Sequence, residues 1–455
     1  MTKMSWVGMV AVIGVLAACS ARGQDSQPAN DEELAKVVRR LEHEVEDLRG
    51  WRFKRPVNVA VCTLDELRAF MDRDTHDDAG GWGEQARSEA ALKMIGVIPP
   101  DCDPAAVFEE VMTAFVPGIY DDETKTLKVV DRPGMDINSL HLHGVIAHEL
   151  VHALDDQYFD LHTMMRDDIS SDESFAVMAI VEGSAVTLQE RFKCRAQRSG
   201  KYDLAAAARA DAAEMEQMRA LFAAPAFVRS FMARFPCGIR FLLRGDMSAF
   251  MNPDGPASVA ETVRAALTNL PRSSEQIIHA EKYWDDAQRD EPVVADDATM
   301  EKLLSGLSLH IVHRDTVGEL MCALLTRPAD QRVNPIMLMM PDTWTNEAAE
   351  GWGGDRLYLL TAAAVEEPLE TAPQDLCALW ITVWDTPTDR DEFLAEYARC
   401  RKQPERTVVP LGDRSAAFLF AANESRRQAI EQALRTAPPL WTHGKRPWSF
   451  DGPVD

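Results

Sequence analysis

One short stretch, Ala147 to Ala153, constrains the fold most, because it sets two histidines four residues apart inside an apolar run. That run, Leu140 to Leu154, is compatible with a helix, on which residues i and i+4 lie on the same face. His148 and His152 can therefore direct both imidazoles at one metal ion. Glu149 lies about 100° further round the helix, within reach of a water molecule on that ion but poorly placed as a third ligand. The pattern H-E-x-x-H is the geometry that zinc-dependent hydrolysis requires.

The alternative interpretation is a pair of exposed histidines on an amphipathic helix. Ile146, Leu150 and Val151 make the helix apolar on most sides, which favours a buried position. Buried imidazoles need a partner, and a metal ion is a suitable one.

A third ligand is predicted in the apolar segment from Phe175 to Leu188, where Glu182 is the only charged residue. A single carboxylate in a buried helix is costly unless it is paired or bound to metal. Gly183 beside it has no side chain, so we expect this helix to approach the histidine helix closely. A salt bridge from Glu182 to an arginine or lysine elsewhere in the chain is the alternative.

H-E-x-x-H followed by a glutamate on a later helix resembles the gluzincin zinc metallopeptidases, the thermolysin-like branch of the zincins. The resemblance implies a zincin-like catalytic core in which His148, His152 and Glu182 bind one Zn²⁺ and Glu149 is the general base. Residues 118–130 look like the zincin hairpin whose edge strand pairs with an extended substrate.

Residues 148–157 are also similar to bacterial proteins that carry H-E-L-V-H-A-L-x-D-Q. Where the thermolysin-like family has an aspartate, four residues after the glutamate ligand, this chain has Val186. The side chains that orient the ligands must then come from elsewhere, and Asp155, Asp156 and Gln157 are the local candidates.

Residues 271–283 resemble a second string of the same bacterial group, P-x-S/T-x-E-Q-x-x-H-x-x-x-Y. A zinc peptidase stabilises the oxyanion of its tetrahedral intermediate, commonly with a tyrosine or histidine donor besides the metal. His279 and Tyr283 are the predicted donors, because a helix would place both on one face. The alternative is that they only fix a loop.

Residues 1–18 are predicted to be a lipoprotein signal peptide, because an apolar run ends in Leu16-Ala17-Ala18 before Cys19. An ordinary secretory signal is the alternative. The run is shorter than the roughly 20 residues that a transmembrane helix needs. Cys19 is therefore the expected lipidation site. We expect an exported protein attached to the lipid bilayer of the cell envelope, on the periplasmic face of the outer membrane if the cell has one, as Ser20 favours.

Four further regions are predicted after the signal peptide: a lipidated cysteine and flexible tether at 19–33, an N-terminal helix at 34–50, a zincin-like metallopeptidase region at 51–356, and a small α+β unit at 357–455. The helix at 34–50 could dock on the domain or pair with a partner helix. The whole is expected to be α+β and predominantly helical.

Composition excludes one class of partner. The net charge is −25 and no basic patch appears, so a nucleic-acid partner is not expected. Besides Cys19 the chain has seven scattered cysteines with no C-x-x-C pair, which disfavours a cysteine zinc site. Seven is an odd number, so at least one thiol stays unpaired whatever disulfides form.

The predicted function is a membrane-anchored zinc peptidase that acts on a peptide or protein substrate. The alternative is a non-proteolytic lipoprotein that keeps the zincin fold as a scaffold for binding or envelope assembly. Zinc binding does not require Glu149, so its presence favours catalysis.

Overall fold

The computed structural model describes residues 31–76, 82–132, 135–166, 168–221, 225–246, 258–328, 331–365, 371–400 and 406–443. The predicted signal peptide, Cys19 and most of the predicted tether lie outside these residues. The fold is α+β, 55% helix and 15% strand, so the predicted, mainly helical class is confirmed at this level. Within the described residues, no helix combines the length and the apolar character that crossing a membrane requires.

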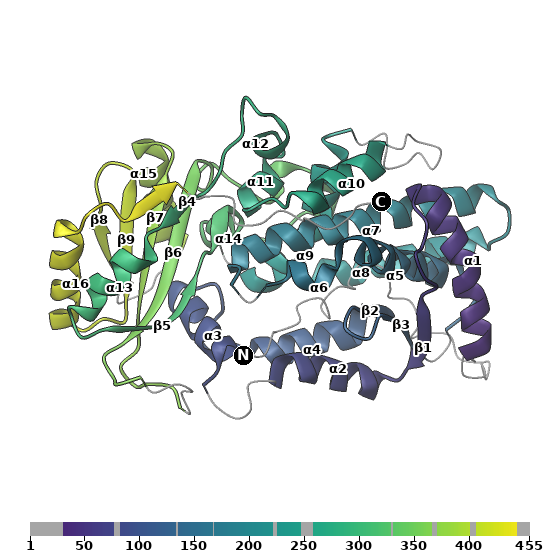
Figure 1. The fold of residues 1–455 in the computed structure, drawn as a ribbon, viewed down its shortest axis with the longest axis horizontal. Helices are drawn as coiled ribbons and strands as arrows, with labels where there is room; N and C mark the ends of the chain where they lie inside the picture. Colours follow the sequence, from purple (N-terminus) through teal and green to yellow (C-terminus); the bar gives the residue numbers. More distant parts are fainter. Residues whose placement is uncertain are drawn as a thin grey trace.

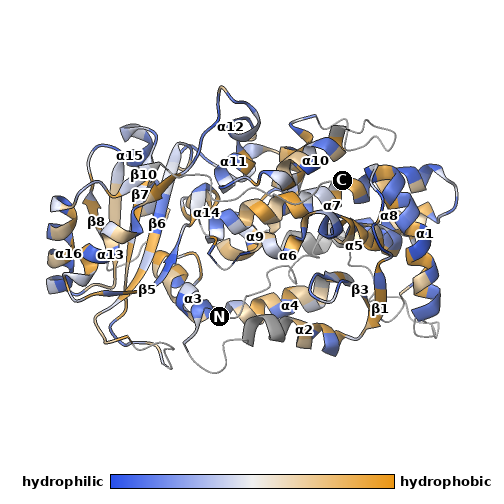
Figure 2. Cartoon of the chain, viewed as in Figure 1, coloured by the Kyte–Doolittle hydropathy of each residue, from blue (hydrophilic) through white to orange (hydrophobic). Residues whose placement is uncertain are grey.

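Helices fill one end of the molecule and a five-stranded sheet fills the other (Figure 1). Polar residues gather on the outward sides of the helices at the two extremes of the view, α1 and α16 (Figure 2). The helices of the helical end are α1 (Asp31–Arg49), α5 (Leu140–Phe159), α6 (Leu161–Met164), α7 (Ser171–Arg198), α8 (Leu204–Leu221), α9 (Ala226–Leu243), α10 (Ser258–Thr268), α11 (Ser274–Ile278) and α12 (Glu281–Trp284).

The N-terminal helix α1 docks on the domain. Its apolar stripe, which includes Leu34, Val38, Leu41 and Val45, is buried, and the helix packs against α5 and α7. Of the two predicted alternatives, docking is therefore the one observed.

Helix α7 crosses α9 at two glycines, Gly183 and Gly238. A Cβ atom on either residue would overlap the backbone of the other helix. The prediction that Gly183 faces the histidine helix is therefore wrong, because this glycine gives close access to α9. Glu182, one residue earlier, points about 100° away, toward α5.

A three-stranded sheet lies beside α5, in the order β1-β3-β2. Its strands are β1 (Asn58–Cys62), β2 (Gly118–Asp121) and β3 (Thr126–Val130), with α2 (Leu64–His76) and α4 (Pro104–Phe115) between β1 and β2. β3 runs parallel to β1 and antiparallel to β2, so the predicted hairpin at 118–130 is present. β2 is the edge strand on the side of α5.

The larger sheet has the order β5-β6-β7-β9-β8 and is antiparallel throughout. Its strands are β5 (His310–Asp315), β6 (Trp352–Thr361), β7 (Cys377–Trp384), β8 (Arg406–Pro410) and β9 (Ser415–Phe420). The short strands β4 (Val293–Ala295) and β10 (Trp441–His443) pair with each other. The remaining segments are α3 (Glu84–Ile95), α13 (Asp297–Ser305), α14 (Gly318–Leu325), α15 (Pro387–Cys400), α16 (Glu424–Thr436) and the 3₁₀ turns η3 (Pro335–Met337) and η4 (Pro341–Thr343). The boundary predicted at 356/357 therefore runs through β6, and the sheet starts some 50 residues earlier, at β5.

The larger sheet is buried on both faces. Side chains alternate between the two faces along its strands, and each face packs into a different core. On β7, Trp380 and Trp384 join the main core, where α15 also packs. Leu379 and Ile381 point the other way, into a second core formed with α13 and α16. Helix α3, from the N-terminal half of the chain, packs on β5, β6 and β7.

Three hydrogen bonds fasten α3 to the sheet end, and one of them joins Glu84 Oε1 to His313 Nδ1 at 2.5 Å. Arg87 Nη1 donates to the carbonyl of Val312 at 3.2 Å. The Tyr397 hydroxyl donates to the carbonyl of Ile95 at 2.9 Å. The two ends of the molecule are thus joined through side chains as well as through the chain itself.

Candidate metal centre

His148, His152 and Glu182 converge in the interior, from α5 and α7. One ligand atom from each lies within 4.8 Å of the other two. Nε2 of His148 is 3.3 Å and Nε2 of His152 is 3.9 Å from Oε2 of Glu182. The two rings lie nearly perpendicular, with centroids 4.7 Å apart. The helical spacing read from the sequence therefore brings these three residues together.

This donor set fits a zinc ion. All three side chains are almost fully buried, and in the described part of the chain no hydrogen bond reaches either carboxylate oxygen of Glu182. Burial raises the pKa of Glu182 well above its usual value, and the charge of Arg234 only partly opposes this. Two imidazoles and one carboxylate are the ligands of many catalytic zinc sites, and a cation would satisfy the buried oxygens.

Gln189 orients one of the candidate ligands. Its Oε1 lies 3.1 Å from Nδ1 of His148, so a neutral ring that donates through Nδ1 keeps the Nε2 lone pair toward Glu182. Gln189 follows Glu182 by seven residues, which is two helical turns on the same face. Sequence reasoning considered position 186 and did not identify Gln189. The seven-residue spacing from Glu182 could have indicated Gln189.

Asp155 does not touch the histidines. Its Oδ2 accepts hydrogen bonds from Arg49 Nη2 at 3.0 Å and from Ser184 Oγ at 2.6 Å. The side chain therefore ties α5 to α1 and α7, and its predicted role in orienting the ligands is not supported by its contacts.

Asp156 and Gln157 also bind elsewhere. Asp156 accepts from the Tyr120 hydroxyl and from Lys125 Nζ, both at 2.8 Å, which fixes the end of α5 to the β2–β3 hairpin. Gln157 is partly exposed and its Oε1 accepts from the backbone N–H of Arg55 at 3.1 Å. Asp156 and Gln157 therefore hold neighbouring segments in place. The side chain that contacts a candidate ligand is Gln189, which bonds to His148.

Glu149 is buried beside the three residues, with 1% of its surface exposed. Its Oε2 accepts a hydrogen bond from the backbone N–H of Tyr120, on β2, at 2.8 Å. Burial raises the pKa of Glu149 to about 8, against the opposing influence of His148. β2 packs closely on α5 at Gly118, where an added Cβ would lie 3.3 Å from Val145 Cγ1.

The structure does not bring His279 and Tyr283 to this centre. His279 caps the end of α11, and Tyr283 lies on the separate helix α12, so the single helical face assumed for them does not exist. His279 Nε2 is 2.9 Å from Glu319 Oε1, and the Tyr283 hydroxyl donates to the carbonyl of Asn269.

The segment that carries His279 and Tyr283 contacts the start of α7, and this explains why the two residues lie far from the metal centre. The backbone N–H of Ser274, at the start of α11, donates to Asp172 Oδ1 at 3.0 Å. Asp172 precedes Glu182 by ten residues, or about 15 Å of helix. The contacts of His279 and Tyr283 thus place them near the start of α7, and the oxyanion role predicted for them is not supported.

Arg234, on α9, is a residue that sequence reasoning missed. It is 7% exposed, and its guanidinium lies 4.8 Å from the ring centroid of Phe231. Burial lowers the pKa of Arg234 to about 10, while the negative charge of Glu182 acts in the opposite direction. No ion pair within 4.0 Å joins Arg234 to Glu182 in the described residues, so Arg234 does not form the direct salt bridge of the alternative interpretation.

The described cysteines form no disulfide. Cys62, Cys102, Cys194, Cys237, Cys322, Cys377 and Cys400 are all free thiols. None of them belongs to the group formed by His148, His152 and Glu182.

Comparison with known proteins reaches only the sheet end of the molecule. Residues 308–434, from the start of β5 to near the end of α16, match a family described as "Domain of unknown function (DUF8575)". The match excludes His148, Glu149, His152 and Glu182. No curated protein matches the chain. No solved structure matches it either.

Proposed function

We propose that the protein is a zinc-dependent peptidase in which His148, His152 and Glu182 hold one Zn²⁺. The observation that carries the proposal is the convergence of three buried ligand atoms, from two helices, within 4.8 Å of one another. Structural ion pairs seldom leave a buried carboxylate without a hydrogen bond, so the state of Glu182 supports a cation site.

Zinc bound there would polarise a substrate carbonyl and lower the pKa of a water molecule. Glu149 would take a proton from the attacking water and pass it to the leaving amine. Two features of the chain support this role: the carboxylate lies one residue from a candidate ligand, and the Tyr120 N–H holds one of its oxygens at 2.8 Å. The other oxygen is left for the proton transfer.

An extended peptide is the substrate that the surroundings favour. β2 borders the small sheet, and in the described residues it pairs only with β3. All four β2 residues are buried and α5 packs against the strand, so a peptide strand would have to enter between β2 and α5 to form backbone hydrogen bonds with the other edge. The Tyr120 N–H on that edge already serves Glu149, so peptide binding and the position of the base are coupled in this proposal.

The alternative is a scaffold that keeps a metal site without proteolysis. The burial of the centre favours it, because His148, His152 and Glu182 are only 3%, 0% and 1% exposed, whereas a catalytic zinc must admit substrate. The two proposals share the metal and differ in the role of Glu149.

Metal analysis and proteolysis of purified protein separate the two. We expect one zinc per chain, loss of zinc in His148→Ala and Glu182→Ala, and cleavage of an unfolded protein substrate by the wild type. Glu149→Gln should keep zinc and lose cleavage, whereas Glu110→Gln, an exposed glutamate on α4, should change neither. Zinc without any wild-type cleavage would favour the scaffold. A wild type that binds no zinc would exclude both.

We also propose that the protein is exported and attached to the bilayer through Cys19. The support is the sequence of residues 1–19 alone, which lie outside the described residues.

A further inference from the structure

A buried arginine lies beside the candidate metal centre without a direct ion pair to it. Arg234, on α9, is 7% exposed, and its Nε and Nη1 atoms meet no hydrogen-bond acceptor in the described part of the chain. Glu182, on α7, is 1% exposed, and neither of its carboxylate oxygens meets a hydrogen-bond donor there. Opposite charges that are buried this deeply usually contact each other or another charged group.

Helices α7 and α9 run antiparallel. The last turn of α9 contacts the end of α11, where Arg240 Nη1 donates to the Ile278 carbonyl at 2.7 Å. The start of α11 is bonded to the start of α7, through the Ser274 N–H and Asp172 Oδ1. The end of α9 therefore lies near the start of α7, and a step back along α9 is a step forward along α7.

Arg234 faces α7 one helical turn before the glycine contact. It precedes Gly238 by four residues, so both lie on the same side of α9, and Gly238 packs against Gly183. One turn back along α9 corresponds to the turn of α7 that follows Gly183, about 5.4 Å further along. Arg234 thus lies within side-chain reach of Glu182, although no ion pair within 4.0 Å joins them in the described residues.

Each of these two side chains is the charge that acts on the other. Burial lowers the pKa of Arg234, and the negative charge of Glu182 opposes that change. Burial raises the pKa of Glu182, and the positive charge of Arg234 opposes that change. Among the described residues, no other charged side chain shifts either pKa. The pair therefore interacts across a gap that is longer than an ion pair.

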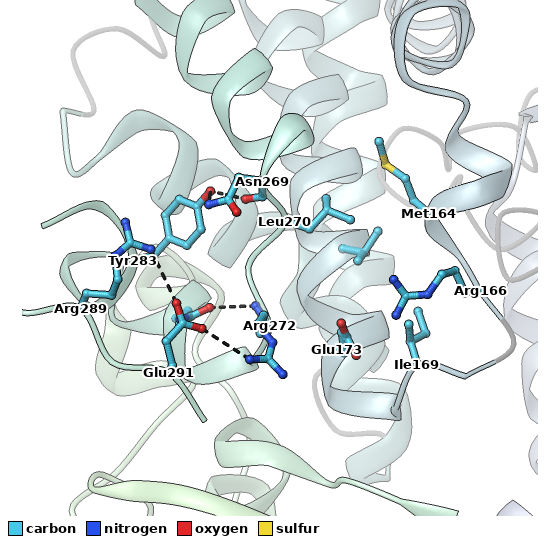
Figure 3. Close-up of a pocket in the computed structure, with 12 residues that line it drawn as sticks. Met164, Arg166, Ile169, Glu173, Asn269, Leu270, Arg272, Tyr283, Arg289 and Glu291 are labelled. Atoms are coloured by element: carbon cyan, nitrogen blue, oxygen red, sulfur yellow. Dashed lines mark hydrogen bonds and ion pairs between the residues drawn. The ribbon is translucent and has the colours of Figure 1, made fainter. Parts of the chain in front are cut away.

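Other arginines of the helical end reach a carboxylate more closely. Figure 3 shows Glu291 between two arginines, 3.8 Å from Arg272 Nη1 and 3.7 Å from Arg289 Nη1. The carboxylate of Glu182 lies instead toward the histidines, with Oε2 3.3 Å from His148 Nε2. Its oxygens are thus placed for a metal ion, while the nearby guanidinium supplies charge without direct contact.

We propose that Arg234 is the resident counter-charge of the metal centre: it balances Glu182 while the centre holds no metal, and it weakens metal binding by repulsion. The inference rests on the proposed function for the presence of a metal. A zinc ion adds positive charge beside a fixed guanidinium, and at separations of a few ångström beyond an ion pair this repulsion costs at least about tenfold in affinity. The centre therefore binds zinc less tightly than its three ligands alone would.

Chelator competition on purified protein measures the repulsion. Arg234→Met keeps an unbranched side chain and removes the charge, so it should bind zinc at least about tenfold more tightly than the wild type. Arg234→Lys keeps the charge and should stay within about threefold of the wild type.

Arg229→Met is the matched control, because Arg229 is a second buried arginine on α9. It is 3% exposed, its Nη1 donates to the Gln331 carbonyl at 3.2 Å, and it does not act on Glu182. This variant should be less stable than the wild type and should bind zinc with unchanged affinity.

Denaturant unfolding of the metal-free protein tests the charge balance without zinc. Arg234→Met should destabilise the chain that has Glu182, because it leaves a buried carboxylate without its counter-charge. In a Glu182→Gln background the same change should be neutral or stabilising, because no negative charge remains to be balanced. The difference between the two effects is the interaction between the side chains.

Two results would overturn the proposal: an Arg234→Met protein with the zinc affinity of the wild type, or equal effects of Arg234→Met in the two backgrounds. Thermal unfolding identifies a variant that fails to fold, and Arg234→Gln then replaces Arg234→Met with the same expectations. Failure of the proposed function gives a different pattern. Neither the wild type nor Arg234→Met would then bind zinc, which would refute the role in metal binding, while the interaction between Arg234 and Glu182 would persist.

Discussion

Replacement of Gly238 by alanine tests the contact that sets the spacing of α7 and α9. Gly238 faces α7, where an added Cβ would overlap the Ala179 carbonyl oxygen and lie 3.1 Å from the Cα of Gly183. Both atoms belong to helical backbone and cannot rotate away. The helices would have to separate by nearly 2 Å to restore an ordinary contact of about 3.5 Å with that oxygen.

The cost follows from two opposing terms. Alanine in a helix interior normally stabilises by about 1 kcal/mol over glycine. Overpacking of a filled core costs about 1–3 kcal/mol, and a collision between two backbones belongs at the upper end. We therefore expect Gly238→Ala to lower the free energy of unfolding by about 2 kcal/mol. Because Glu182 adjoins Gly183, zinc affinity should fall as well.

Chemical denaturation measures the first effect, and Gly144→Ala is the matched control. Gly144 lies within α5, and its added Cβ would meet Lys193 Cε at 3.1 Å, the far end of a flexible side chain. This variant should be as stable as the wild type or more stable by up to about 1 kcal/mol. A Gly238→Ala protein as stable as Gly144→Ala would refute the reasoning.

Three further predictions concern single side chains. Gln189→Leu should weaken zinc binding about 10–100-fold, measured by competition with a chelator, whereas Asp155→Asn should lower stability more than zinc affinity. Burial alone would lower the pKa of His279, but the hydrogen bond and charge of Glu319 outweigh it and raise that pKa. This stabilisation is complete below the unfolded pKa of about 6.5 and is lost as pH rises through the folded value. The stability advantage of the wild type over His279→Gln should thus shrink from pH 5 to pH 9, and a constant difference would contradict it. Cys19→Ser should abolish lipid labelling and release the protein from membranes in cell fractionation; unchanged labelling would exclude Cys19 as the anchor.

The local part of the candidate site could be predicted from the sequence. His148 and His152 share a face because the helix repeat fixes it, and Ser139, whose hydroxyl accepts from Leu142 N–H at 3.1 Å, caps that helix. Glu182 is notable in the sequence because no other charge interrupts its apolar segment. These inferences need only the geometry of a helix and the cost of burying a charge.

The remaining contacts depend on how distant segments pack. Gly183 signalled a close approach, but nothing in the sequence indicated that Gly238 was its partner. His279 and Tyr283 appear to share one helix when they are counted four apart, yet the chain turns between α11 and α12. Gln189 becomes informative only once Glu182 is known to face α5. In each case, the local sequence pattern did not show which segment the residue meets.

The attachment of α3 to the large sheet limits how far residues 308–434 can act as an independent module. A fragment with those bounds would lack both Arg87, which caps the Val312 carbonyl, and the Ile95 carbonyl that the Tyr397 hydroxyl uses. It would also lack α13, which covers part of the opposite face. Transplanted by itself, this segment would expose apolar surface on both sides of its strands. A protein that carries the same family segment therefore needs its own substitutes for α3 and α13.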